Sequence, residues 1–91
     1  YSPNKKIRIN AIDVKENEAL LNFGKNNLTS NIKSLNLSSK NDLVEASHNF
    51  YNFINILDQT ECKTIAVAPI PNHGLGKTIN DRLKRASYND E

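Results

Sequence analysis

Short apolar stretches along the chain predict four β-strands. Ile7-Arg8-Ile9 alternates apolar and polar positions, which is typical of a strand with one buried face. Residues 19–23 and 64–68 are almost continuously apolar, and two prolines close the second stretch. Such runs fit strands covered on both faces, as in a parallel sheet. Residues 32–37 form a further strand candidate.

Two longer segments have the spacing of amphipathic helices. Asp42 and Glu45 have capping-box spacing, and we expect a helix from about residue 42 to 59. A second helix is expected over about residues 75–86. Apolar residues recur at steps of three and four, so those of each helix share one face. The expected buried positions are Leu43, Ala46, Phe50, Ile54 and Leu57 in the first helix and Leu75, Ile79, Leu83 and Ala86 in the second.

The order strand–strand–strand–helix–strand–helix predicts an α/β fold. We expect a mostly parallel sheet of about four strands, flanked by two main helices. The connection through the first helix is long enough for a right-handed parallel crossover. In such a sheet Gly24, residues 36–39 and residues 72–76 share the carboxyl edge, where open α/β sheets bind ligands.

Composition limits the chain to one small domain, because it has only 91 residues. It contains no methionine and begins Tyr1-Ser2-Pro3, so we expect it to be a piece of a longer protein. Residues 1–40 carry seven bases and three acids, and residues 41–91 carry five bases and seven acids. This distribution leaves no continuous basic stripe of the kind that nucleic-acid binders use.

The cysteine content and the hydropathy pattern bear on location. The single cysteine, Cys62, can form neither an internal disulfide nor a metal cluster, which favours a reducing compartment. No apolar run approaches the roughly 18 residues of a membrane span. We therefore expect a soluble, cytoplasmic protein with no membrane partner.

The most suggestive local signal is Gly76-Lys77-Thr78, the tail of a phosphate-binding P-loop. Pro71 stands where that motif needs glycine, and because proline lacks an N–H, the loop cannot wrap phosphates in the usual way. A helix start after Gly-x-Gly still offers N–H groups to an anion or nucleotide. The candidate binding residues are Gly74, Gly76, Lys77, Thr78, Asn80 and Arg82. The alternative is that the glycines only allow a sharp turn from strand to helix.

The remaining reactive side chains form no recognisable chemical site. His48 lies on the first predicted helix and His73 in the loop at the expected ligand edge. Neither histidine has a second metal ligand at useful spacing, so we expect no metal. Cys62 lacks an activating base in the sequence around it, which indicates a non-catalytic thiol.

Five motifs follow one another along most of the chain. They are Leu35-Asn36-Leu37-Ser38, Asp42-Leu43-Val44-Glu45-Ala46, Ile65-Ala66-Val67-Ala68-Pro69-Ile70-Pro71, Gly74-Leu75-Gly76 and Ile79-Asn80-Asp81-Arg82-Leu83-Lys84-Arg85-Ala86. In this order they resemble the C-terminal domain of the two-domain form of threonylcarbamoyl-AMP synthase, in the YrdC-like synthase family. Tyr1-Ser2-Pro3 is similar to the end of that family's interdomain linker. Ser39-Lys40-Asn41 departs from the pattern, which has a proline- or glycine-containing turn there.

The resemblance implies a Rossmann-like C-terminal accessory domain over residues 7–91 and the end of an interdomain linker over residues 1–6. It further implies that the missing N-terminal domain of the same chain is catalytic and uses ATP with Mg²⁺, threonine and bicarbonate. That domain would release pyrophosphate and make threonylcarbamoyl-AMP for threonylcarbamoyladenosine in tRNA. Tyr1, Ser2 and Pro3 would lie near its active site. No catalytic residue or cofactor is then expected in the 91 residues themselves.

Three hypotheses about function follow. In the first, the chain is a non-catalytic domain that supports the linker and the catalytic domain of a nucleotidyltransferase, with tRNA-pathway proteins as indirect partners. In the second, it is a free-standing α/β module that binds a nucleotide or anion at the Gly74–Thr78 helix start. In the third, RNA docks on the basic N-terminal segment with an affinity that falls steeply with salt.

Overall fold

A parallel four-stranded sheet and two helices make up residues 5–88, which are the part of the chain that the computed structural model describes. The elements are β1 (Lys6–Arg8), β2 (Glu18–Asn22), β3 (Ser34–Asn36), α1 (Leu43–Asp58), β4 (Thr64–Val67) and α2 (Leu75–Tyr88). The strand order is β1-β4-β2-β3, and every pair is parallel. The expected α/β fold is confirmed, with each strand within two residues of its predicted position.

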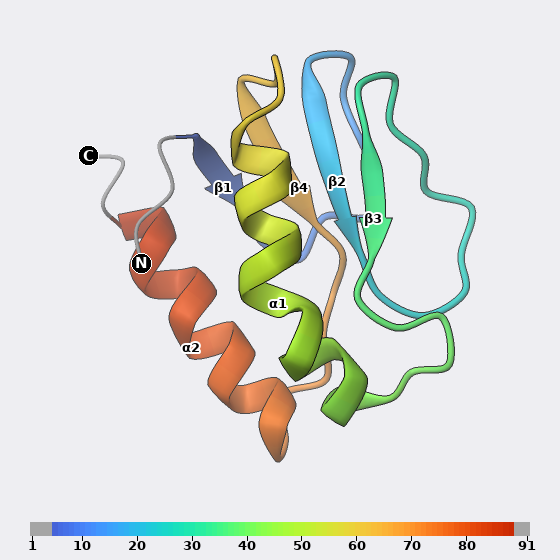
Figure 1. The fold of residues 1–91 in the computed structure, drawn as a ribbon, viewed down its shortest axis with the longest axis vertical. Coiled ribbons are helices and arrows are strands. Elements are labelled where there is room, and N and C mark those ends of the chain that lie inside the picture. Colours follow the sequence, from blue (N-terminus) through green and yellow to red (C-terminus); the bar gives the residue numbers. More distant parts are fainter. Residues whose placement is uncertain (1–4, 89–91) are drawn as a thin grey trace.

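Both helices lie on the same face of the sheet (Figure 1). Helix α1 packs over β2 and β3, and α2 packs beside it over β1. Strand β4 is the last strand along the chain, yet it lies between β1 and β2. Within residues 5–88, neither helix is both long and apolar enough to cross a membrane.

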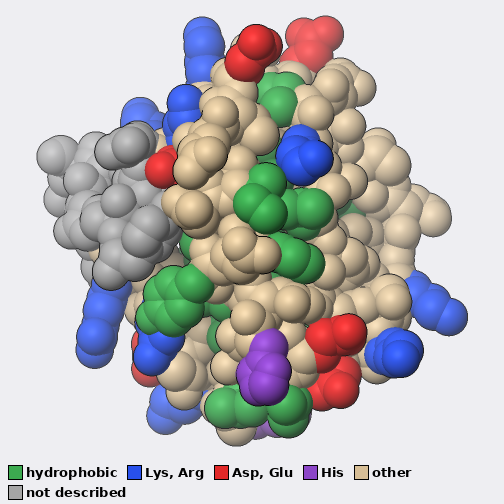
Figure 2. All heavy atoms as spheres, viewed as in Figure 1, with side chains coloured by type: hydrophobic (Ala, Val, Ile, Leu, Met, Phe, Trp, Pro, Cys, Tyr) green, Lys and Arg blue, Asp and Glu red, His purple; other side chains and the backbone are tan. Residues whose placement is uncertain are grey.

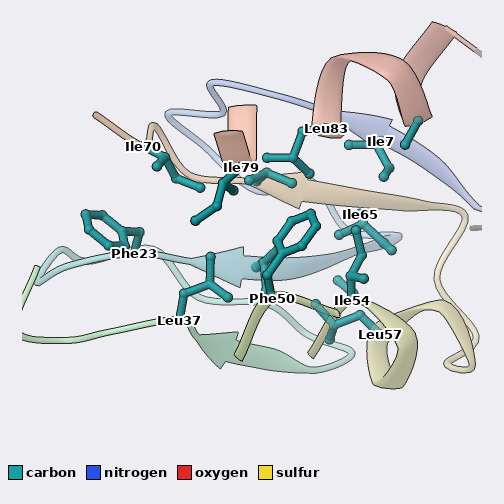
Figure 3. Packing of buried hydrophobic residues seen from close by; sticks show 14 of the residues in the cluster. Ile7, Phe23, Leu37, Phe50, Ile54, Leu57, Ile65, Ile70, Ile79 and Leu83 are labelled. Carbon is teal, nitrogen blue, oxygen red and sulfur yellow. The ribbon is translucent and has the colours of Figure 1, made fainter. Parts of the chain in front are cut away.

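The main core fills the space between the sheet and the helices (Figure 3). Ile7 of β1 and Ile65 of β4 are partners in neighbouring strands, and both side chains are buried there. Helix α1 contributes Phe50, Ile54 and Leu57, all at positions predicted to be buried. Burying one such large apolar side chain contributes about 1.5–3 kcal/mol to folding.

The opposite face of the sheet is also covered. Because side chains alternate along a strand, Leu20 and Ala66 point away from the helices, yet neither is exposed to solvent. The connection between β1 and β2 passes behind the sheet here (Figure 1), and the Ala11 N–H donates to the Val67 carbonyl at 2.8 Å. Strand β4 is therefore buried on both sides, as its continuous apolar sequence predicted.

One predicted core position is wrong. Leu75 is 41% exposed, while the rest of the expected stripe on α2 is buried. The first turn of α2 instead turns Gly76 toward the body of the protein, where a Cβ would lie 2.0 Å from the Pro71 carbonyl oxygen. Only a residue without a side chain fits this approach, so Leu75 is rotated toward solvent.

Helix α1 has a well-formed N-terminus. The Asp42 carboxylate accepts hydrogen bonds from the N–H groups of Val44 at 2.9 Å and Glu45 at 3.3 Å. Asn41 precedes this cap with φ of +60°, in the left-handed region that asparagine tolerates better than most residues.

This cap gives a first prediction. Asp42→Ala removes the acceptor for two helix N–H groups and should lower the free energy of unfolding by about 1 kcal/mol. Asp42→Asn keeps an acceptor oxygen and should cost much less. Urea unfolding followed by far-UV circular dichroism measures both. Equal losses in the two variants would show that the cap does not act through this oxygen.

Candidate functional site

The start of α2 places the predicted Gly-x-Gly segment at the carboxyl edge of the sheet. Gly74 has φ of +55° and lies open to solvent, while Gly76 is buried against Pro71. The Gly76 N–H donates to the His73 carbonyl at 3.0 Å, and the Lys77 N–H donates to the Gly74 carbonyl at 3.2 Å. Two of the N–H groups expected to bind an anion are therefore used to close the turn.

The other candidate residues of this segment extend in different directions. Lys77 and Thr78 are exposed in the first turn of α2. The Asn80 side-chain amide donates to the Ile70 carbonyl at 2.9 Å, which ties it to the connection between β4 and α2.

Arg82 lies further along α2 and reaches the neighbouring helix. Its guanidinium carbon lies 5.1 Å from the ring centroid of Tyr51 of α1, and one N–H donates to the Tyr51 hydroxyl. The six candidates thus do not converge on one point, and an anion site at the helix start stays a prediction.

The remaining predicted residues are placed as follows. Tyr1, Ser2 and Pro3 lie outside the described residues. His48 and His73 are exposed, and Cys62 is buried with its Sγ 3.5 Å from the Leu57 carbonyl oxygen. Among residues 5–88, no group of three or more His, Cys, Asp or Glu side chains could hold a metal ion.

An ion pair that the sequence reasoning missed lies on the face of the sheet away from the helices. The Arg8 guanidinium donates to both carboxylate oxygens of Glu18, at 2.9 Å from Nε and 2.6 Å from Nη2. It reaches across β4 to do so, with Arg8 level with Ala66 of that strand and Glu18 level with Thr64. The Lys15 N–H donates to the same carboxylate at 2.8 Å.

The surroundings of this pair determine its electrostatics. Glu18 is 5% exposed, so its charge is largely removed from water. The hydrogen bonds from Arg8 are the main reason that the pKa of Glu18 lies below its ordinary value, and the Lys15 N–H adds to this effect. Asp13 lies on the outer side of Arg8, with its carboxylate 3.3 Å from Nη1 and 67% exposed.

The sequence carried a signal for this pair. Arg8 alternates with Ile7 and Ile9 in a predicted strand, and Glu18 immediately precedes another predicted strand. A base and an acid at such positions can pair only if the two strands lie within reach. The strand order, which the sequence pattern did not supply, was needed to bring them together.

A hollow of about 580 Å³ opens beside the pair, at the amino edge of the sheet. Its lining includes Lys6, Lys15 and Lys63 as well as Glu16 and the Arg8–Glu18 pair. The lining has four bases and two acids, so the hollow carries a modest excess of positive charge. Figure 2 shows the other face of the molecule, which the helices cover, and there the Lys and Arg side chains of the described residues are spread apart.

The second prediction concerns this ion pair and pH. A group whose pKa is lowered by folding stabilises the protein above its unfolded pKa, and this stability is lost as the pH falls through the folded pKa. The free energy of unfolding should therefore fall as the pH drops below about 4.5, the ordinary pKa of Glu18. Glu18→Gln should remove this part of the pH dependence in urea titrations.

A matched pair of variants separates this ion pair from general charge effects. Arg8→Met leaves the buried carboxylate without its main donor and should cost about 2–3 kcal/mol at pH 7. Asp13→Ala removes only the exposed outer partner and should cost less than about 1 kcal/mol. Similar losses in the two variants would contradict the structural role of the pair.

The third prediction tests why glycine stands at position 76. Helix propensity alone makes alanine about 1 kcal/mol better than glycine. A Cβ here would lie 2.0 Å from the Pro71 carbonyl oxygen, so Gly76→Ala should instead destabilise the protein by about 1–3 kcal/mol. Thr78→Ala, at an exposed position of the same turn, should be neutral or stabilising. Thermal unfolding compares the two, and a stabilised Gly76→Ala variant would contradict the packing role.

One of three comparisons with known proteins found a match, and it agrees with the order of motifs along the chain. The family model described as "Threonylcarbamoyl-AMP synthase, C-terminal domain" matches residues 1–87. Neither the search of curated proteins nor the search of solved structures found a match. The family match spans all four strands and nearly all of α2. The chain therefore belongs to the family of C-terminal domains of threonylcarbamoyl-AMP synthase.

Proposed function

We propose that this chain is the accessory domain of an L-threonylcarbamoyladenylate synthase and supports the linker and the catalytic domain. The reaction would join threonine, bicarbonate and ATP into threonylcarbamoyl-AMP with release of pyrophosphate, for the modification of adenosine in tRNA. The family match over residues 1–87 is the observation that carries this proposal. The class of the parent enzyme would be nucleotidyltransferase, and its location the cytoplasm.

The way the chain enters the sheet supports a role in holding a linker. The Lys5 N–H donates to the Asp58 carboxylate at 2.9 Å, at the last residue of α1. Lys6 then begins β1, which pairs with β4. The first described residues are thus held by a helix end and by a strand. A segment that precedes them would leave the domain at a defined place.

In this proposal the domain contributes no catalytic residue and binds no cofactor. ATP and Mg²⁺ would be bound by the upstream catalytic domain of the same chain, as the resemblance to the synthase family implies. Bound there, Mg²⁺ would neutralise charge on the phosphates of ATP. The catalytic domain would be the direct partner, and tRNA-pathway proteins would be indirect ones.

The fourth prediction tests this role in the full-length two-domain enzyme. Removal of residues 1–91 should abolish threonine-dependent release of pyrophosphate from ATP. Asp58→Ala should lower the rate several-fold without unfolding the domain, because the anchor of Lys5 is lost. Glu61→Ala removes an exposed acid near the same edge and should leave the rate unchanged.

These assays separate the need for the domain from the role of the anchor at Lys5. A catalytic domain that keeps full activity without residues 1–91 would contradict any supporting role. Equal rates in the Asp58→Ala variant and the unchanged enzyme would contradict the anchor at Lys5 but not the need for the domain. Thermal unfolding of each variant shows whether a lost rate reflects lost folding.

A further inference from the structure

A small polar cavity lies at the carboxyl edge of the sheet, and its lining shares no residue with the neighbouring Gly74–Thr78 turn or with the Arg8–Glu18 pair. It has a volume of about 160 Å³ and is lined by Ile9, Asn10, Ile70, Asn72, Asn80 and Lys84. These residues come from the segment after β1, the segment after β4, and two successive turns of α2. The segment after β1 therefore meets the β4–α2 connection and α2, about 60 residues later in the chain, around one cavity.

The topology favours a binding site at this place. Strands β1 and β4 are neighbours, but the chain leaves them toward opposite faces of the sheet (Figure 1). After β1 it passes behind the sheet, and after β4 it leads to α2 in front. Open parallel sheets bind ligands in the crevice outside the carboxyl ends of strands where connections diverge in this way. The cavity lies in that crevice.

The lining determines the chemistry of the ligand. Three asparagine amides and the Lys84 ammonium provide hydrogen-bond donors, and the lining contains no acidic side chain. Asn80 uses one of its two N–H groups to bind the Ile70 carbonyl at 2.9 Å, which fixes the amide beside the cavity. A set of donors with one positive charge and no acid is complementary to an anion that accepts several hydrogen bonds.

The size sets a limit on that anion. Pockets for whole cofactors and drug-sized ligands measure roughly 300–1,000 Å³, and this cavity has about 160 Å³. It can enclose a group of a few heavy atoms but not a complete nucleotide. We propose that the cavity between β1, β4 and α2 binds a small oxyanion of the size of phosphate, held by Lys84 and the amides of Asn10, Asn72 and Asn80. The proposal does not depend on the role in the synthase.

Two sources of such an oxyanion are compatible with this chemistry. It can be free inorganic phosphate, or the phosphate of a nucleotide whose remaining atoms lie outside the cavity. Titrations with inorganic phosphate and with AMP, at constant ionic strength, separate these sources. If AMP binds at least as tightly as phosphate at the same residues, the nucleotide is the source. If only phosphate binds, the free ion is the source.

The experiment uses ¹⁵N-labelled chain and follows backbone and side-chain amide shifts during each titration. The expected result is saturable shifts of Asn10, Asn72 and Asn80, with Gly74, Gly76 and Lys77 nearly unmoved. Lys84→Gln should weaken binding about tenfold or more, because a charge-assisted contact is lost. Lys77→Gln removes the same charge from the same helix outside the cavity, and should change the affinity by less than about twofold at this ionic strength.

Three results would overturn the proposal. In the first, the amides around the cavity do not move at tens of millimolar phosphate or AMP. In the second, Lys84→Gln and Lys77→Gln weaken binding equally, which would assign the anion to general surface charge. In the third, the largest shifts occur at Gly74–Lys77, which would assign the anion to the helix start. Lys84 is exposed, so its replacement should leave the fold intact, and the spectrum of the unliganded variant checks this.

Discussion

The placement of β4 between β1 and β2 is the constraint on which the rest of the structure depends. It requires a strand that is apolar on both faces, with large side chains toward the helices and small ones behind. Ile65 and Val67 fill the first role, and Ala66 fills the second. On the face behind the sheet, Arg8 of β1 reaches across β4 to Glu18 of β2, the strands on either side of it. The core on one face and the ion pair on the other therefore share one strand.

The same placement creates the crevice at the carboxyl edge. Since β1 has β4 as its sheet neighbour, the segment after β1 and the segment that leads to α2 begin side by side and then separate. The first turn of α2 closes against Pro71 through Gly76 and brings Asn80 to Ile70. A glycine that resembles part of a phosphate-binding motif thus serves mainly to pack a helix, and the polar cavity lies one helical turn further on.

Much of the fold could be predicted from the sequence, because apolar spacing is a local property. The limits of α1, the Asp42 cap and the double burial of β4 all follow from residues close together in the chain. Leu75 was wrongly predicted to be buried, because its exposure depends on the close approach of Gly76 to the Pro71 carbonyl. Pro71 lies in the non-helical loop before α2, so helical spacing does not reveal this contact. The Arg8–Glu18 pair and the cavity at Lys84 could not be predicted, since both depend on strand order. Spacing within one element does not specify which strands become neighbours.

The strand order also bears on when the parts of the molecule form during synthesis. Within this domain β1 is the first strand to be made, but its partner β4 ends only at Val67. Residues 6–8 therefore have no partner strand until most of the domain has been made, while β2 and β3 can pair much earlier. Contacts that span long stretches of chain are slow to form. The start of the domain, where any upstream segment is attached, consequently cannot be fixed in the sheet before β4 has been made.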